Sequence, residues 1–259
     1  MNHWVMDYET LKNCFVAVFT HYKSEETHIF SICKLQNDYE KFIEFLGQNI
    51  DNNEWHISYN GLAFDAQVTQ NIIKDHQHGR HEKMDGESIA EEIYGYAQDA
   101  IKRSNNRDFQ KFPEWDLTIK QIDVFKLNHW DNVAKMSSLK WIQYSMDWDN
   151  IIDMPIHHET SIDTQEQLDL IIKYCINDVD STKEIFERSK PLITLRKNLT
   201  DQYNINLYSA SEPRISKELF AYYLSKELKI PKYELKKLRT FRSVIKIKGL
   251  ILDYIKFET

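Results

Sequence analysis

The stretch that decides the fold is WVMDYETLKNCFVAVFTHYKSEETHIFSI, residues 4–32. It contains three short apolar-rich runs at 4–9, 14–19 and 27–32, separated by polar connections. Short apolar runs bounded by polar residues are typical of strands, so this stretch predicts a three-stranded meander.

The residues that follow extend this pattern into a mixed fold. Residues 39–50 carry apolar side chains at helical spacing, and 55–60 has the composition of a buried strand. A second helix is predicted to begin near Phe64. The order strand, strand, strand, helix, strand predicts an α/β or α+β sheet. Residues 75–115 are polar and poorly periodic around a candidate helix at 89–101, and we interpret them as an insertion or a mobile flap.

Further along, 118–127 resembles a strand and 137–146 a helix. The strongest helix prediction covers about 164–188, where apolar residues recur at steps of three and four behind an Asp163/Thr164 N-cap. Glu166/Gln167 are placed to complete a capping box with this N-cap. Pro191 is predicted to end the compact body, and a further helix is predicted at 211–228.

Composition excludes several classes of protein. The chain has 259 residues, 42% of them hydrophobic, which is enough for a sizeable core. Its six glycines never have the spacing of a nucleotide-binding loop, and its three cysteines form no CxxC pair, which excludes zinc fingers and a disulfide scaffold. Cysteine usage fits a reducing, cytoplasmic setting. The sequence has no apolar run of about 20 residues and no signal peptide, so no membrane partner is expected.

Charge is distributed unevenly along the chain. The net charge is −7, yet residues 190–259 hold 15 Lys/Arg against 7 Asp/Glu, a net of +8, which leaves −15 for residues 1–189. One interpretation is an acidic, metal-binding body joined to a basic segment that meets phosphate. The alternative is that the lysine-rich helices form a solvated face.

Three short motifs carry acids in positions that suit chemistry. Asp7 and Glu9 are two apart on a predicted strand, so both carboxylates should leave one face and invite a divalent cation. Asp65, in SYNGLAFD, lies where a strand leads into a helix, a common place for functional residues, although it could equally cap the helix. Tyr174 and Asp178 are four apart on a helix and share a face, whereas Asp180 should point elsewhere.

The combination of DxE on the first strand, NxxxFD at the next strand–helix junction and YxxxD on a late helix resembles the DnaQ-like (DEDD) 3′–5′ exonucleases. The likeness is greatest to proofreading domains of phage DNA polymerases and covers roughly residues 1–190. Tyr174, four residues before the last aspartate, places the chain with the tyrosine subtype. The resemblance implies a ribonuclease-H-like mixed central sheet flanked by helices. The chain continues beyond it with a basic, mostly helical extension at 191–259, of which 243–259 resembles the linker that leads into the polymerase core of some phage DNA polymerases. If the protein is phage-encoded, it would act in the host cytoplasm.

The resemblance also implies roles for individual residues. Two Mg²⁺ or Mn²⁺ ions suit an all-carboxylate set, with Asp7, Glu9 and Asp178 at one ion and Asp7 and Asp65 at the other. Tyr174 would orient the attacking water. The single-stranded DNA 3′ end would be contacted by Thr10, Leu11, Asn60, Phe64 and Lys140, although Phe64 could instead be a core residue.

Other readings stay open. His76, His78 and His81 could be metal ligands or part of a solvated loop. The substrate could be RNA instead of DNA, or the chain could be a non-catalytic nucleic-acid-binding adaptor. Met1, six residues before Asp7, is expected to be the natural start of the protein, whereas the chain ends abruptly at Thr259. The partner expected from the resemblance is therefore a DNA polymerase core, either in the same longer chain or as a separate subunit.

Overall fold

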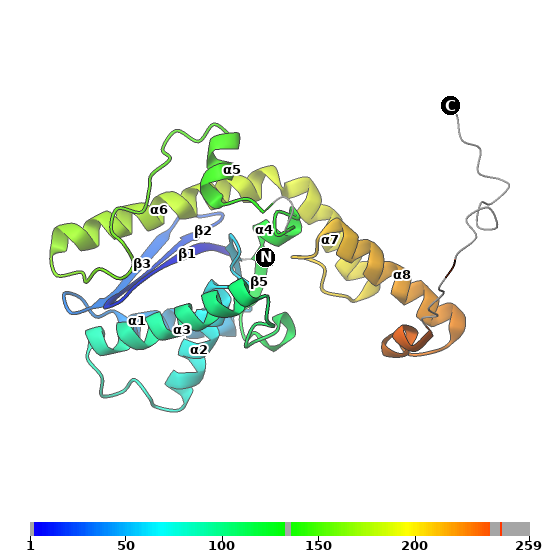
Figure 1. Ribbon diagram of the computed structural model, residues 1–259, viewed down its shortest axis with the longest axis horizontal. Helices are drawn as coiled ribbons and strands as arrows, with labels where there is room; N and C mark the ends of the chain where they lie inside the picture. The colour runs from blue at the N-terminus through cyan, green and yellow to red at the C-terminus, as the bar shows by residue number, and fades with distance from the viewer. Residues whose placement is uncertain (1–2, 133–135, 239–243, 245–259) are drawn as a thin grey trace. The chain divides into compact units, whose positions relative to one another are not determined.

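A computed structural model describes residues 3–132, 136–238 and 244. Its centre is a five-stranded sheet with the order β3-β2-β1-β4-β5 (Figure 1). The first three strands, β1 (His3–Leu11), β2 (Cys14–His21) and β3 (Thr27–Cys33), form the predicted antiparallel meander. Strands β4 (Trp55–Ser58) and β5 (Lys120–Asp123) continue the sheet in parallel with β1. The predicted α/β class with a mixed central sheet is confirmed.

Helices α1 (Tyr39–Asp51), α2 (Asp65–Gln77) and α3 (Gly86–Asn106) cover one face of the sheet (Figure 1). Because side chains alternate along a strand, Trp4, Met6 and Tyr8 of β1 all point to this face. They pack there in an aromatic core with Phe42 and other buried residues.

Helix α6 (Gln165–Arg188) covers the opposite face (Figure 1), together with α4 (Val124–Leu127) and α5 (Leu139–Ser145). Val5 and Leu11 of β1 point to this side and pack with Ile171 and Val179 of α6. The predicted capping box is present: Thr164 accepts from the Gln167 backbone N–H, and the Gln167 side chain accepts from the Thr164 N–H. The 164–188 prediction is thus confirmed to within a residue.

Two predictions need correction. The candidate helix at 89–101 is present as α3, but residues 75–115 as a whole are not a flap, because α3 buries Ile89, Ala90 and Ile93 in the core against the sheet. The polar residues on either side of this helix led to that interpretation. The predicted strand at 118–127 stops at Asp123, whose carboxylate accepts hydrogen bonds from the next backbone N–H groups and starts α4. A short helix η1 (Glu114–Asp116) precedes β5.

The first of two compact units extends to Glu212, beyond residue 190 where the body was expected to end. Pro191 does not terminate it; the proline lies in the first turn of α7 (Lys190–Tyr203), where its missing N–H costs nothing. Arg196 of α7 is fully buried and donates to the backbone oxygens of Leu127 and Ala210. These bonds tie residues 190–210 to the body.

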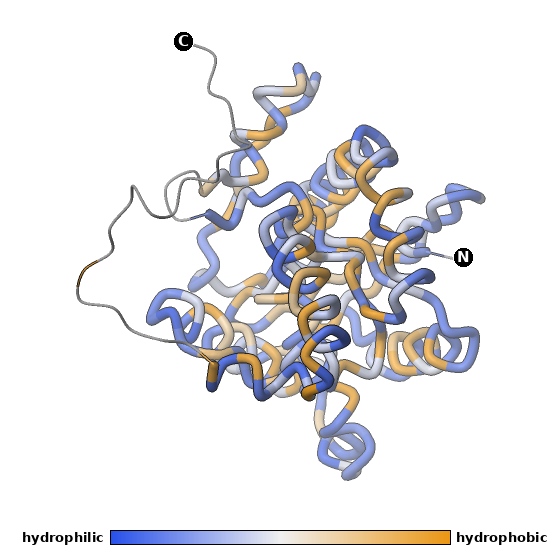
Figure 2. Tube along the Cα trace, turned by 90° about the vertical axis from the view of Figure 1, so that its right-hand side faces the viewer, coloured by the Kyte–Doolittle hydropathy of each residue, from blue (hydrophilic) through white to orange (hydrophobic). Residues whose placement is uncertain are grey.

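The second unit, Pro213–Thr259, contains α8 (Glu212–Leu228) from its second residue onward and the short helix η2 (Lys232–Leu238). The 211–228 helix prediction is confirmed. The segment at 243–259, expected to be a linker that leads into a polymerase core, lies outside the described residues except for Val244. Apolar positions recur along the helices with polar positions between them (Figure 2). Within residues 3–132, 136–238 and 244, no helix is both long and apolar enough to cross a membrane.

Candidate active site

The site begins with Asp7 and Glu9 on β1. Both belong to the face that carries Val5 and Leu11, so their carboxylates emerge from an otherwise apolar surface beneath α6. Ligand atoms of Asp7, Glu9 and Cys175 lie within 4.8 Å of one another. The predicted common face of the two acids is therefore present.

Asp65 reaches the same place from the first residue of α2. Its position depends on the preceding loop, in which Asn60 adopts a left-handed conformation with φ of 64°. At Gly61, a Cβ atom would lie 1.8 Å from the Ser58 hydroxyl oxygen, so the close approach of loop and strand requires glycine.

Asp123, at the end of β5, anchors that loop and was not singled out from the sequence. Its fully buried carboxylate accepts from the Asn60 N–H at 3.0 Å and from the Leu62 N–H at 3.1 Å. Burial raises its pKa, while the hydrogen bonds that it accepts favour the charged form. Asp123 thus supports Asp65 without lining the cleft.

Helix α6 contributes Tyr174 and Asp178, which lie one turn apart on the same face, as their spacing predicts, and are close enough that each shifts the pKa of the other. Asp178 also accepts from the Gln143 side chain at 3.0 Å, and Gln143 donates to Ser181 on the same helix. The fully buried Gln143 of α5 therefore fixes this carboxylate, a role that its polar sequence context did not reveal. Asp180 is exposed, as its position around the helix predicts.

The four carboxylates destabilise one another's charge. Burial is the main cause that raises the pKa of Asp7 and of Glu9, and neighbouring acids raise both further. Burial also raises the pKa of Asp178, and it raises the pKa of Asp65 to about 7. Among the described residues, Asp65 Oδ1 is buried with no hydrogen-bond partner. Such a concentration of poorly compensated negative charge creates a strong preference for a cation.

The chemistry of the donors fits a hard divalent ion. All four acids offer oxygen, which Mg²⁺ and Mn²⁺ prefer. The nearby Cys175 does not act as a thiolate here, because burial and the carboxylates raise its pKa, and its sulfur donates to the Asp7 backbone oxygen at 3.4 Å. The residues present therefore suit magnesium or manganese better than zinc.

The acids line a cleft of about 920 Å³. Asn60 and Phe64 line it too, and Phe64 is only partly buried, although it packs at the edge of the aromatic core. Residues not foreseen from the sequence complete the lining: Tyr8, Tyr59, Phe125, Met136, Ser137, Ser138, Leu139 and Trp141.

Two of the aromatic lining residues, Tyr59 and Trp141, differ in their surroundings. Tyr59 is held in place, because its hydroxyl donates to the Ser137 backbone oxygen at 2.7 Å and its ring lies 5.1 Å from that of Phe125. Trp141 has 60% of its surface exposed and stacks on Tyr144. An exposed tryptophan beside a cleft is a binding signal, but sequence patterns alone do not separate it from core aromatics.

Three predicted substrate contacts lie outside the lining. The strand pleat turns Thr10 to the opposite face, and Leu11 is fully buried in the core under α6. Lys140 lies nearby, with its Nζ 5.7 Å from the centre of the Tyr174 ring, and it forms an ion pair with Asp153 at 2.7 Å. Its charge lowers the pKa of Glu9 and Asp178, which places it within electrostatic reach of the acids.

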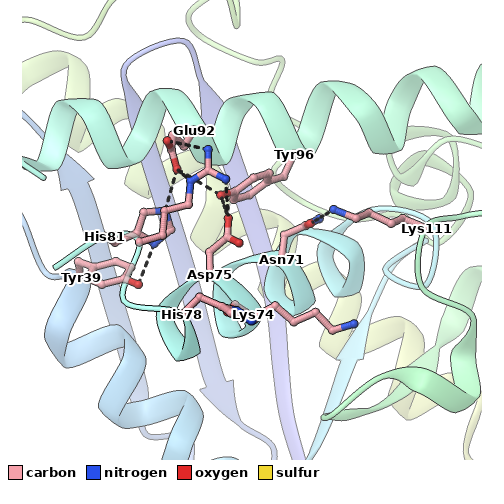
Figure 3. A network of polar contacts seen from close by, with 10 residues as sticks. Tyr39, Asn71, Lys74, Asp75, His78, His81, Glu92, Tyr96 and Lys111 are labelled. Carbon is pink, nitrogen blue, oxygen red and sulfur yellow. Dashed lines mark hydrogen bonds and ion pairs between the residues drawn. The ribbon is translucent and has the colours of Figure 1, made fainter.

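A second polar cluster involves the predicted histidine motif (Figure 3). His81 is buried between the Tyr39 hydroxyl, 2.9 Å from Nδ1, and Glu92, 3.0 Å from Nε2. Arg80 pairs with Glu92 and Asp75. His81 therefore does not belong to a solvated loop. Although Asp75, His81 and Glu92 have metal-like spacing, Arg80 already neutralises the two carboxylates, so the cluster is a structural link among α1, α2 and α3.

Comparison with protein-family models and with curated proteins finds no match to this chain.

Proposed function

We propose that this protein is a metal-dependent 3′–5′ exonuclease of the DnaQ-like tyrosine subtype, acting on single-stranded DNA ends in proofreading for a DNA polymerase. The observation that carries the proposal is the meeting of Asp7, Glu9, Asp65 and Asp178 in one cleft, although three separate elements supply them. The mixed sheet with helices on both faces supports the ribonuclease-H-like form of the fold.

In this proposal, Asp7, Glu9 and Asp178 would hold one divalent ion, and Asp7 and Asp65 would hold the second. Two such ions, when bound, would supply an activated water and stabilise the leaving oxygen of an in-line phosphodiester displacement. The protein's own contribution is to fix the carboxylates before substrate arrives, with Gln143 orienting Asp178 and Asp123 holding the loop before Asp65.

Tyr174 is assigned an orienting role. Burial and the adjacent acids raise the pKa of its phenol, so the hydroxyl stays protonated at neutral pH. A protonated hydroxyl can donate to or position a water molecule, but it is a poor general base. This agrees with orientation of the attacking water and not with proton abstraction.

The cleft walls suit an unpaired strand. Phe64, Tyr59 and Trp141 present aromatic surface on which bases can stack, a sequence-tolerant contact that adds about 1–3 kcal/mol per base. The side chain of Asp153 is 95% exposed, so Lys140 can leave its ion pair with Asp153 and bind a substrate phosphate instead. These contacts fit a frayed single-stranded end better than a duplex.

The test is a time course with 5′-labelled single-stranded DNA and a matched RNA, with Mg²⁺ or Mn²⁺ and with a chelator. A metal-dependent ladder that shortens from the DNA 3′ end is expected. Asp7→Ala should abolish it, whereas Asp169→Asn, an exposed change on the outside of α6, should not. Circular dichroism would show that both variants fold.

The other outcomes are equally informative. Cleavage that survives Asp7→Ala would overturn the site assignment. A ladder on RNA alone would change the substrate class to RNA. No cleavage of either the DNA or the RNA by the folded protein would favour a non-catalytic adaptor. Tyr174→Phe should retain measurable activity, with a loss on the order of 10- to 100-fold.

A further inference from the structure

Two cysteines that lie 19 positions apart in the sequence are brought face to face by the sheet. Cys14 begins β2 and Cys33 ends β3, and the two are direct partners in the antiparallel register. Directly opposed residues point to the same face, and both thiols belong to the core cluster on the α6 side. Neither is in a disulfide.

The backbone hydrogen bonds show which kind of pair this is. The Cys33 N–H donates to the Gln36 oxygen at 2.7 Å and not to β2. The position is therefore a non-hydrogen-bonded pair, in which Cα atoms approach to about 4.5 Å. That separation lies at the short end of the range that a disulfide spans. The two thiols are close enough that each shifts the pKa of the other.

The pair is chemically asymmetric. A hydrogen bond from Cys14 lowers the pKa of the Cys33 thiol to about 6, and the backbone N–H groups of Gln36 and Leu35 help. The same contact, together with burial, raises the pKa of Cys14. Cys33 is thus suited to be the attacking thiolate and Cys14 the resolving thiol.

A small oxidant would have to approach from the side of Cys33, which is 2% exposed and lies beside a surface cleft. Cys33 lines a surface cleft of about 330 Å³ between the end of β3 and the start of α3. Gly86, at the start of α3, allows the two segments to approach, since a Cβ there would lie 2.5 Å from the Cys33 backbone oxygen. Cys175 has no part in this arrangement, because its sulfur faces Asp7.

We propose that Cys14 and Cys33 are a redox-active pair that closes to a reversible disulfide across β2 and β3 when the protein meets a hydroperoxide. The Cys33 thiolate attacks a peroxide oxygen, the O–O bond breaks, and hydroxide leaves and takes up a proton as water. The resulting sulfenic acid is attacked by the Cys14 sulfur, which loses its proton as a second water departs. Two thiols and one hydrogen peroxide thus give one disulfide and two waters, and a dithiol reductant restores the pair.

The experiment treats the whole chain with hydrogen peroxide, alkylates remaining thiols under denaturing conditions, and digests with trypsin without reductant. Cleavage after Lys12, Lys23 and Lys34 places the two cysteines on separate peptides. A linked peptide, lighter than the sum of its parts by two hydrogens, is expected in the wild type and in Cys175→Ala. It should disappear in Cys14→Ala. In that variant, dimedone added with the peroxide should instead form an adduct with the sulfenic acid of Cys33.

Stability provides a second readout. Closing a loop of about 20 residues should raise the apparent melting temperature by roughly 5–10 °C, and dithiothreitol should reverse the rise. Cys33→Ala, checked for folding in reductant, should show neither the link nor the rise. Recovery of both cysteines as alkylated thiols after peroxide, or a Cys33 adduct without any link in the wild type, would overturn the proposal.

Discussion

Replacement of Asp65 by asparagine should stabilise the metal-free protein and abolish its proposed activity. Asp65 is 2% exposed and Oδ1 has no hydrogen-bond partner within the described residues. Burial raises its pKa to about 7, compared with about 3.9 in an unfolded chain. The folded protein therefore binds more protons than the unfolded chain in this interval, and its stability falls as pH rises from about 4 to 7.

The magnitude follows from the size of the shift. About three pKa units correspond to about 4 kcal/mol of unfolding free energy lost above pH 7, an upper value because asparagine also brings an amide that needs a partner. The unfolding free energy of Asp65→Asn should exceed that of the wild type by little near pH 4 and by about 2–4 kcal/mol near pH 8. The Asp65 charge also raises the pKa of Asp7 and Glu9, so the stability difference between the two proteins reports the burial of Asp65 together with its repulsion of these two acids.

The assay is urea denaturation in chelator at several pH values, for the wild type, Asp65→Asn and the exposed control Asp169→Asn. Added Mg²⁺ should restore wild-type stability at high pH and restore Asp65→Asn less, because a ligand oxygen is lost. A stability difference that does not grow with pH would refute the reasoning about buried charge. An equal response of the two proteins to Mg²⁺ would refute the placing of Asp65 at a metal ion.

The other predictions concern the support of the site. Asp123→Ala should lower the unfolding free energy by about 3 kcal/mol in urea denaturation and reduce the proposed nuclease activity, because the loop before Asp65 loses its acceptor. Unchanged activity would show that the loop keeps its conformation without Asp123. Gly61→Ala should lower the unfolding free energy by about 1–3 kcal/mol, whereas Gly47→Ala, where a Cβ meets nothing within 4 Å, should raise it slightly. Calorimetry compares the two variants, and equal melting temperatures would argue against the close approach of Gly61 to Ser58. Arg196→Met should lower the unfolding free energy in urea denaturation by about 3 kcal/mol, since three backbone oxygens lose the donor that Arg196 provides. A decrease below 1 kcal/mol would show that α7 is held by its apolar contacts instead.

Much of the fold could be predicted because its signals are local. Runs of apolar residues located the meander, and the three- and four-residue repeat with a capping box located α6 nearly to the residue. The segment around α3 was misjudged because polar, poorly periodic residues precede and follow the helix in the sequence, although the helix itself has a clear buried face. The end of β5 was missed because a buried carboxylate, Asp123, ends the strand and starts the next helix.

The candidate site divides in the same way. Strand alternation put Asp7 and Glu9 on one face, and helical spacing put Tyr174 beside Asp178. The same alternation argues against Thr10 as a cleft residue, a consequence that the motif-based assignment overlooked. Leu11 shares the face of the two acids, and only the packing of α6 shows that it is fully buried. Gln143 and Tyr59 could not be found from the sequence, because their roles depend on partners more than 30 positions away.

The sequence by itself determined the strands, most helices and the local geometry of each acidic motif, because these depend on periodicities of two and 3.6 residues. Only the tertiary structure decided that the motifs meet, that Asp123 and Gln143 hold them, and that Cys14 faces Cys33. The physical reason is that burial, charge repulsion and strand register are properties of segments packed together, and no short window of sequence contains both partners.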